Sequence, residues 1–124
     1  IIHAIEHALS GIQPKLAHGA GLAIIGPRAI YYTHRAMPKE SATVLRPIAP
    51  ELKGVPEEAE EAARAVAEFQ RSVGFEERLS DYGFGRDDVK EVIELVLGPL
   101  RHLSEETPFP VSEGIIKDIY LSSL

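Results

Sequence analysis

The chain has 124 residues, 44% of them hydrophobic, which suits one folded domain with a buried core and argues against a disordered tail. Nineteen acidic against 13 basic residues give a formal net charge of -6, and no segment concentrates Lys and Arg, so we expect neither nucleic acid nor a membrane surface as a partner. The absence of Cys excludes disulfides, thiolate metal sites and cysteine nucleophiles, so any metal must be held by His and carboxylate side chains.

The sequence also indicates a compartment and a habitat. It has no signal peptide, no lipidation motif and no apolar run long enough to cross a bilayer, so the cytoplasm is the expected compartment. It contains no Asn and one Met beside nine Pro and many ion-pairing residues, a bias reported for proteins of thermophiles.

The first nine residues read as the interior of a helix. They include no N-cap residue and no initiating Met, so we expect that the chain continues upstream of Ile1 in the intact protein. Gly11 is the expected C-cap, and residues 13–15 the connecting loop. A second helix is predicted from about residue 18 to 32, bent at Pro27 and apolar at nearly every position, which places it near the middle of the domain.

The remaining predicted elements are also helical. A third helix is expected over residues 39–48, and the clearest one covers residues 56–73, where Pro56 takes a favourable first position and acidic residues crowd the positive end. A short helix around Glu76 is expected to include Leu79. Further helices are predicted over residues 87–97 and, after a Ser112 cap, 113–121, with a polar surface loop at 103–110. Since no alternating β-branched run occurs, the predicted fold class is all-α.

Three of the five histidines, His3, His7 and His18, fall within the first 18 residues. On a helix, His3 and His7 lie on the same face with β-carbons within ~6 Å, because they are four residues apart. The loop through Pro14 lets His18 fold back towards that face. Converging neutral imidazoles suit Zn, Fe, Co or Ni rather than Mg or Ca.

Other interpretations of these histidines stay open. A His pair at this spacing also arises by chance, and a non-catalytic helical interaction module would carry it incidentally. The order His3, Glu6, His7 also fits the H-x-x-E-H motif of inverted zinc peptidases, with Glu6 as general base, although that motif leaves His18 unexplained. His34, at a polar helix end, and His102, in a loop, are expected to be structural.

A resemblance to a known family extends over essentially the whole chain. The run from His3 to Gly11, a short loop, the His18-Gly19 pair and Pro27 resemble the active-site signature of the iron-containing, group III, metal-dependent alcohol dehydrogenases. The likeness to the C-terminal domain of that family extends further along the chain. It includes the acidic helix predicted over residues 56–73, residues 73–75 and 79–83, and the Pro-containing stretch before the last helix. The implied fold is the helical bundle of dehydroquinate synthase-like and iron-type alcohol dehydrogenases.

The resemblance implies a function and the roles of three residues. Residues 1–124 correspond to a single helical metal-binding domain, while the N-terminal nucleotide-binding domain that holds most of the NAD or NADP is absent. His3 and His18 correspond to two ligands of a divalent metal, Fe or Zn, whose other ligands are an upstream Asp and His. His7 corresponds to a residue that orients substrate or relays the hydroxyl proton.

The implied reaction is hydride transfer between an alcohol and a nicotinamide, which interconverts the alcohol with an aldehyde or ketone. The resemblance identifies no nucleotide-binding residue in this chain. It also implies that the fragment alone is inactive, that its partner is a small-molecule substrate, and that homo-oligomers can form.

Overall fold

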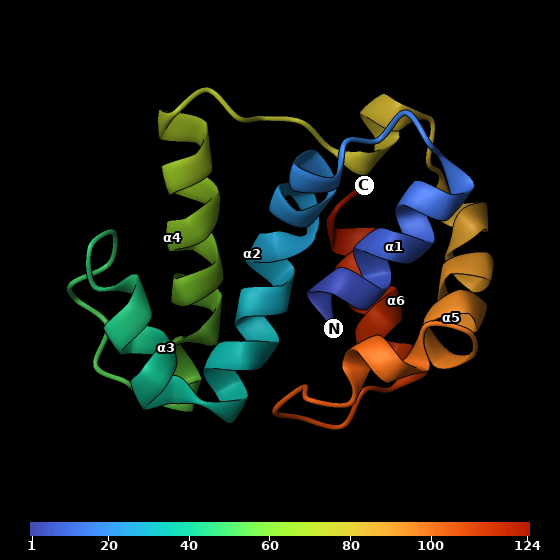
Figure 1. Cartoon of the computed structure of the whole chain (residues 1–124). Coiled ribbons are helices and arrows are strands. Elements are labelled where there is room, and N and C mark those ends of the chain that lie inside the picture. Colours follow the sequence, from blue (N-terminus) through green and yellow to red (C-terminus); the bar gives the residue numbers. More distant parts are fainter. The chain divides into compact units, whose positions relative to one another are not determined.

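The computed structural model describes residues 1–124, and every regular element in it is helical, which confirms the all-α prediction (Figure 1). None of the helices combines the length and the apolar character needed to span a membrane. The α-helices are α1 (Ile2–Ile12), α2 (His18–Ala36), α3 (Pro38–Leu45), α4 (Ala59–Ser72), α5 (Val89–Leu97) and α6 (Glu113–Ser122). Single 3-10 turns are η1 (Pro56–Glu58), η2 (Leu79–Tyr82), η3 (Arg86–Asp88) and η4 (Arg101–Ser104).

The chain divides into two compact units. Unit 1 comprises Ile1–Ile25 and Glu77–Leu124, and unit 2 comprises Gly26–Glu76. Helix α2 begins in unit 1 and ends in unit 2, and the boundary falls next to Pro27, through which the helix continues. All three histidines of the predicted metal site therefore belong to unit 1.

The core of unit 1 is built by α1, α5 and α6, with α5 in contact with both of the others. Each helix is amphipathic, and the apolar residues three or four positions apart turn inward. The hydroxyl of Tyr120 donates to the carbonyl oxygen of Gly85 at 2.6 Å, and burial raises the pKa of Tyr120 to about 12. The buried apolar residues of these helices are Ala4, Ile5, Ala8, Leu9, Val92, Val96, Ile116, Ile119 and Tyr120.

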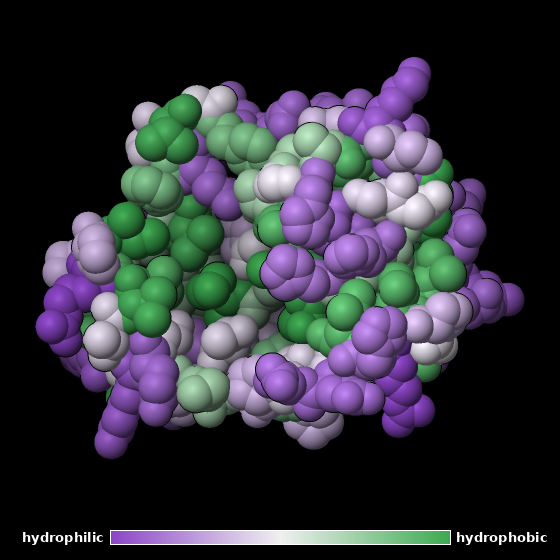
Figure 2. All heavy atoms as spheres, in the orientation of Figure 1, coloured by the Kyte–Doolittle hydropathy of each residue, from purple (hydrophilic) through white to green (hydrophobic).

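Unit 2 has its own small core, which α3 and α4 share with the second half of α2. Helix α3 ends at Leu45, so Ile48, expected inside this helix, lies in the turn that follows and still packs on the core. Figure 2 shows that hydrophobic side chains also reach the surface of this unit, where Val44, Phe69 and Val73 are exposed. The core consists of Leu45, Ala49 and Ala62, with Ile30, Ile48, Leu52, Ala65 and Val66 packed against it.

The helix ends confirm one predicted cap and correct another. The N–H of Ile115 donates to Ser112 Oγ at 3.2 Å, so Ser112 caps α6 as predicted. The Gly11 cap was wrong, because α1 continues to Ile12 and ends at Gln13, which has an extended backbone. A glycine C-cap uses a left-handed conformation, and Gly11 has no positive φ.

Three other predicted boundaries change. The helix expected over 56–73 opens as the 3-10 turn η1 before α4 begins. The helix expected around Glu76 is reduced to the turn η2, which starts at Leu79. The loop expected over 103–110 is helical at its start, because η4 extends to Ser104.

Candidate metal centre

Helix α1 presents a buried apolar face and an exposed polar face. His3 and His7 are exposed, whereas Ala4, Ile5 and Ala8 are buried in unit 1. The apolar face fixes the rotation of α1 about its axis, because turning it would expose that face. The two imidazoles are thus held on the outer side of the helix, four residues apart, as their spacing predicts.

The loop between α1 and α2 brings His18 to this face. The N–H of Leu16 donates to the carbonyl of Gln13 at 3.0 Å, which closes a tight turn, and the Leu16 side chain is buried. The Gln13 side-chain amide donates to the carbonyl of Tyr82 at 3.2 Å and so fastens the loop to η2. Helix α2 then begins at His18, beside α1.

The structure places all three predicted histidines together. The ring centroids of His3 and His18 lie 5.5 Å apart, and those of His7 and His18 lie 5.6 Å apart. His18 is therefore the ring that both α1 histidines approach. Two histidines four residues apart on one helix and a third at the start of the next give a rigid base for a site.

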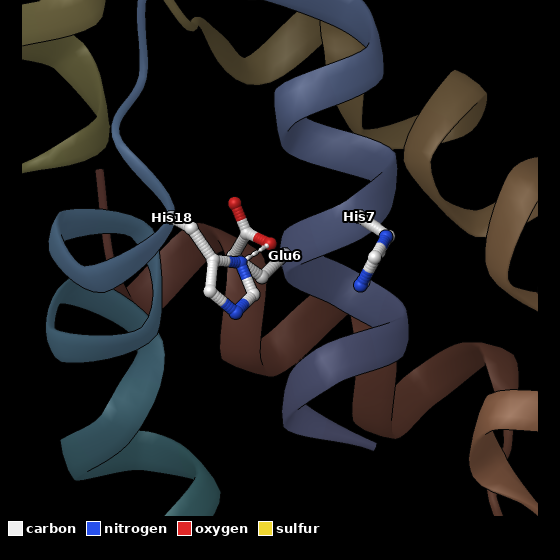
Figure 3. Close-up of side chains that lie close together, drawn as sticks. All are labelled: Glu6, His7 and His18. Atoms are coloured by element: carbon white, nitrogen blue, oxygen red, sulfur yellow. Dashed lines mark hydrogen bonds and ion pairs between the residues drawn. The ribbon is translucent and has the colours of Figure 1, made fainter.

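One group of possible metal-donor atoms includes a residue that the sequence did not assign to the metal site. Atoms of Glu6, His7 and His18 that could bind a metal all lie within 4.8 Å of one another (Figure 3). Converging imidazole nitrogens fit a divalent transition metal such as Zn or Fe. The residues present therefore suit the metal that the sequence predicts, and Glu6 lies beside His7 and His18 in this group.

Glu6 is the buried member of the group. Its side chain is 1% exposed, whereas that of His18 is 52% exposed. The carboxylate accepts a hydrogen bond from His18 Nδ1 through one oxygen and another from Ser10 Oγ through the other. Two features of the sequence are consistent with a buried, hydrogen-bonded Glu6, namely the Ser four residues after it and the small Gly21 early in α2. Neither feature identifies such a residue unless the packing of α1 against α2 is known.

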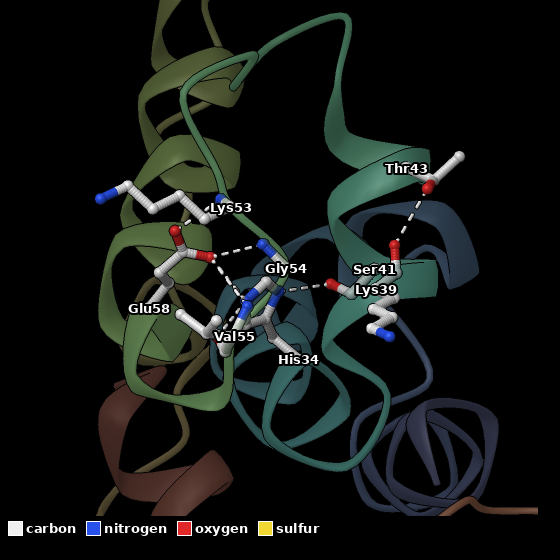
Figure 4. Close-up of polar contacts among 8 residues, drawn as sticks. All are labelled: His34, Lys39, Ser41, Thr43, Lys53, Gly54, Val55 and Glu58. Atoms are coloured by element: carbon white, nitrogen blue, oxygen red, sulfur yellow. Dashed lines mark hydrogen bonds and ion pairs between the residues drawn. The ribbon is translucent and has the colours of Figure 1, made fainter.

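His34 lies outside the centre, and its structural role is as expected (Figure 4). It is fully buried in unit 2, although the sequence suggested a polar helix end. Its Nε2 lies 3.0 Å from the carbonyl oxygen of Val55, which can only accept, so Nε2 carries a proton. Its Nδ1 lies 2.9 Å from Ser41 Oγ and, in the neutral ring, accepts from that hydroxyl. His102 is exposed in η4.

Glu58 completes the polar cluster around His34. Its carboxylate accepts from the backbone N–H groups of Lys53 at 2.5 Å, Gly54 at 3.0 Å and Val55 at 3.3 Å, and lies 3.5 Å from His34 Nε2. The hydrogen bond from Lys53 is the largest cause that lowers the pKa of Glu58, and it outweighs the opposing effect of burial. This cluster fastens the loop before α4 and leaves no imidazole nitrogen free for a metal.

Comparison with known proteins places the whole chain in one family. Residues 1–124 match the C-terminal part of the Fe-containing alcohol dehydrogenase family. The long-chain primary alcohol dehydrogenase AdhA of Thermoanaerobacter ethanolicus is 37% identical over 125 residues, which cover 99% of this chain and 31% of that protein. The chain thus spans about a third of the length of this relative.

Two solved structures share the fold. An archaeal halo-thermophilic alcohol dehydrogenase from a Red Sea brine pool, ADH/D1, superposes on 100% of this chain with a TM-score of 0.82 and 22% identity. A 1,3-propanediol oxidoreductase superposes on 99% of it with a TM-score of 0.79 and 22% identity. Each match covers 32% of the larger protein. The chain belongs to the Fe-containing alcohol dehydrogenase family, and it corresponds to the C-terminal, helical part of its members.

Proposed function

We propose that this chain supplies the helical, metal-binding part of an NAD(P)-dependent alcohol dehydrogenase. The enzyme would interconvert an alcohol and an aldehyde or ketone by hydride transfer at a divalent cation, Fe²⁺ or Zn²⁺. The observation that carries this proposal is the convergence of His3 and His7 on His18, at 5.5 and 5.6 Å between ring centroids, in a chain that matches the family over its full length.

His3 and His18 would hold the cation. They come from different helices, and both side chains are exposed. Two imidazoles do not complete a coordination sphere, so further ligands would come from parts of the protein outside these residues. When bound, the cation would act as a Lewis acid towards the alcohol oxygen.

His7 would handle the proton. In the oxidation of an alcohol, hydride leaves the carbinol carbon for the nicotinamide, and the hydroxyl proton must leave separately. A ring nitrogen of His7 would accept that proton and release it to solvent, to which the side chain is exposed. In the reverse direction the same imidazole would return a proton to the carbonyl oxygen.

The dinucleotide would bind mainly outside these 124 residues. The relatives are about three times longer than the chain. We therefore expect the isolated 124-residue chain to bind metal weakly and to have no dehydrogenase activity.

The structure argues against the zinc peptidase alternative. A general base must reach a water molecule beside the metal, but the Glu6 side chain is 1% exposed. Both of its oxygens already accept hydrogen bonds, one from His18 and one from Ser10. Glu6 is therefore poorly placed to activate water.

The test uses the full-length gene product, purified without oxygen and loaded with Fe²⁺ or Zn²⁺. Primary alcohols of increasing chain length are offered with NAD⁺ and with NADP⁺, and reduced nicotinamide is followed by its absorbance. We expect alcohol-dependent reduction and stoichiometric metal, and both should be lost in His18→Ala. The matched control is His102→Ala, an exposed histidine of the same unit, which should keep both.

Two results would count against the proposal. Wild-type protein that binds no stoichiometric metal and reduces neither nucleotide would favour a non-catalytic interaction module. Unchanged metal content in both His3→Ala and His18→Ala would remove these two histidines from the ligand set.

A further inference from the structure

We propose that Glu6 is a positioning residue for the metal centre, which holds the His18 imidazole in one tautomer and one orientation so that Nε2 is presented to the cation. This inference rests on the proposed function, because it takes His18 to be a metal ligand. In this proposal Glu6 neither binds the cation directly nor moves the proton of the substrate.

The contact between Glu6 and His18 determines where the imidazole carries its proton. Glu6 Oε2 and His18 Nδ1 are hydrogen bonded. A carboxylate can only accept, so the proton lies on Nδ1 and donates to Glu6. In a neutral imidazole the lone pair is then on Nε2, which points away from Glu6 in Figure 3. Nε2 is thus the only nitrogen of this ring that is free to bind a metal.

Ser10 holds the carboxylate in place. It lies one turn after Glu6 on α1, and its hydroxyl donates to Oε1. The same hydroxyl oxygen lies 3.4 Å from the carbonyl of Leu16, in the loop that leads to His18. Because each oxygen of Glu6 has a protein donor, the carboxylate is oriented by α1 towards the ring and is a poor candidate for a direct ligand.

Gly21 provides the space that this carboxylate occupies. A Cβ at position 21 would lie 2.8 Å from Cγ and 3.1 Å from Oε1 of Glu6. Any larger residue would therefore force the Glu6 side chain to move. A carboxylate buried to this degree is costly unless charged or polar partners surround it. The donors of His18 and Ser10 supply such partners, and a cation beyond the imidazole would add to them.

A carboxylate behind a metal-binding imidazole has a known physical effect. It fixes the ring and raises the basicity of the nitrogen that faces the metal, and its removal commonly costs about 10–100-fold in metal affinity. Glu6 is therefore expected to affect metal affinity strongly while leaving the ligand set unchanged.

The experiment compares Glu6→Ala and Glu6→Gln with the wild type in the full-length protein. Zn²⁺ affinity is measured by competition with a chelator, and the His18 tautomer is read from nitrogen chemical shifts of ¹⁵N-histidine-labelled, metal-free protein. Circular dichroism confirms folding. Glu91→Ala, which removes an exposed carboxylate from α5 of the same unit, is the matched control.

Glu6→Ala should weaken Zn²⁺ binding by about 10–100-fold and give His18 a mixture of tautomers. Glu6→Gln keeps an accepting oxygen, so it should keep the Nδ1–H tautomer and lose less affinity. Glu91→Ala should change neither.

Three outcomes overturn the inference. Unchanged Zn²⁺ affinity in Glu6→Ala, in a protein whose Zn²⁺ binding His18→Ala abolishes, removes the role of Glu6 and leaves the proposed function standing. Abolition of binding by both Glu6 variants, with the Nδ1–H tautomer intact, makes Glu6 a direct ligand instead. Wild-type protein that binds no Zn²⁺ or Fe²⁺ refutes the proposed function, and with it the positioning role, whatever the tautomer.

Discussion

Gly21 and Glu6 approach so closely that no Cβ fits between them, since an added Cβ would lie 2.8 Å from Glu6 Cγ. This contact joins the first turns of α2 to α1 at the point where the histidines meet. The geometry of the candidate metal centre therefore depends on a close helix approach as well as on the histidines themselves.

The first prediction concerns this approach. Gly21→Ala should destabilise the protein by about 1–2 kcal/mol, because overpacking costs about 1–3 kcal/mol and alanine returns only about 0.5–1 kcal/mol of helix propensity. It should also weaken Zn²⁺ binding, since a shift of the Glu6 side chain would disturb its hydrogen bond with His18. Chemical denaturation and chelator competition measure the two effects.

Gly11→Ala is the matched control, because Gly11 is also helical but a Cβ there would meet nothing within 4 Å. Gly11→Ala should have the stability of the wild type or a slightly higher one, and its Zn²⁺ affinity should be unchanged. Equal behaviour of the two variants would show that the space beside Glu6 is not needed.

The sequence predicted the meeting of the three histidines but not the part of Glu6. The spacing of His3 and His7 on one helix is a local property, and the short loop limits how far His18 can be. The contact of Glu6 with His18 depends on the rotation of α1 against α2, which is set by burial of apolar residues throughout unit 1. Such non-local packing leaves no short motif, and the only motif that includes Glu6 is H-x-x-E-H.

The same distinction between local signals and non-local packing holds for the fold. Ser112 was predicted as a cap from its own side chain and the residues that follow it, and the structure confirms it. The predicted end of α1 at Gly11 is wrong, because Gly11 remains helical. Gln13 leaves the helix, and its side chain is bonded to Tyr82, which lies far along the chain. His34 was expected at a polar helix end, but it is buried, and its Nε2 is bonded to the carbonyl of Val55 in the loop before α4.

The second prediction separates structural from exposed histidines. His34→Ala should destabilise the protein by about 2–4 kcal/mol, because it leaves a cavity and removes the partner of Ser41 Oγ and the Val55 carbonyl. His102→Ala should have almost no effect, since this side chain is exposed. Denaturant titration measures both. A loss of bound metal in folded His34→Ala protein would contradict a purely structural role.

The third prediction is a pH dependence of stability. The pKa of Glu58 is lowered in the folded state by the backbone N–H groups it accepts from, above all that of Lys53. The contribution of the Glu58 carboxylate to folding stability is therefore fully present above the ordinary pKa of 4.5. It is lost as the pH falls through the lower, folded-state pKa. Glu58→Gln should lower Tm at neutral pH and make Tm fall less on acidification.

Glu61→Gln provides the comparison, because Glu61 is an exposed carboxylate on α4 of the same unit. It should reproduce the wild-type dependence of Tm on pH. Parallel curves for wild type and Glu58→Gln would show that the Glu58 carboxylate makes no pH-dependent contribution.

The fourth prediction decides the role of His7, for which two interpretations differ. The family resemblance makes it the residue that moves the proton, whereas its donor atoms lie within 4.8 Å of those of Glu6 and His18, as a ligand's would. If His7 moves the proton, His7→Ala in the full-length enzyme should lower kcat by about 10²–10⁴-fold and keep the bound metal. His18→Ala should lose the metal. Metal analysis of both variants beside steady-state kinetics distinguishes the two roles, and loss of metal from His7→Ala would make His7 a ligand rather than the proton carrier.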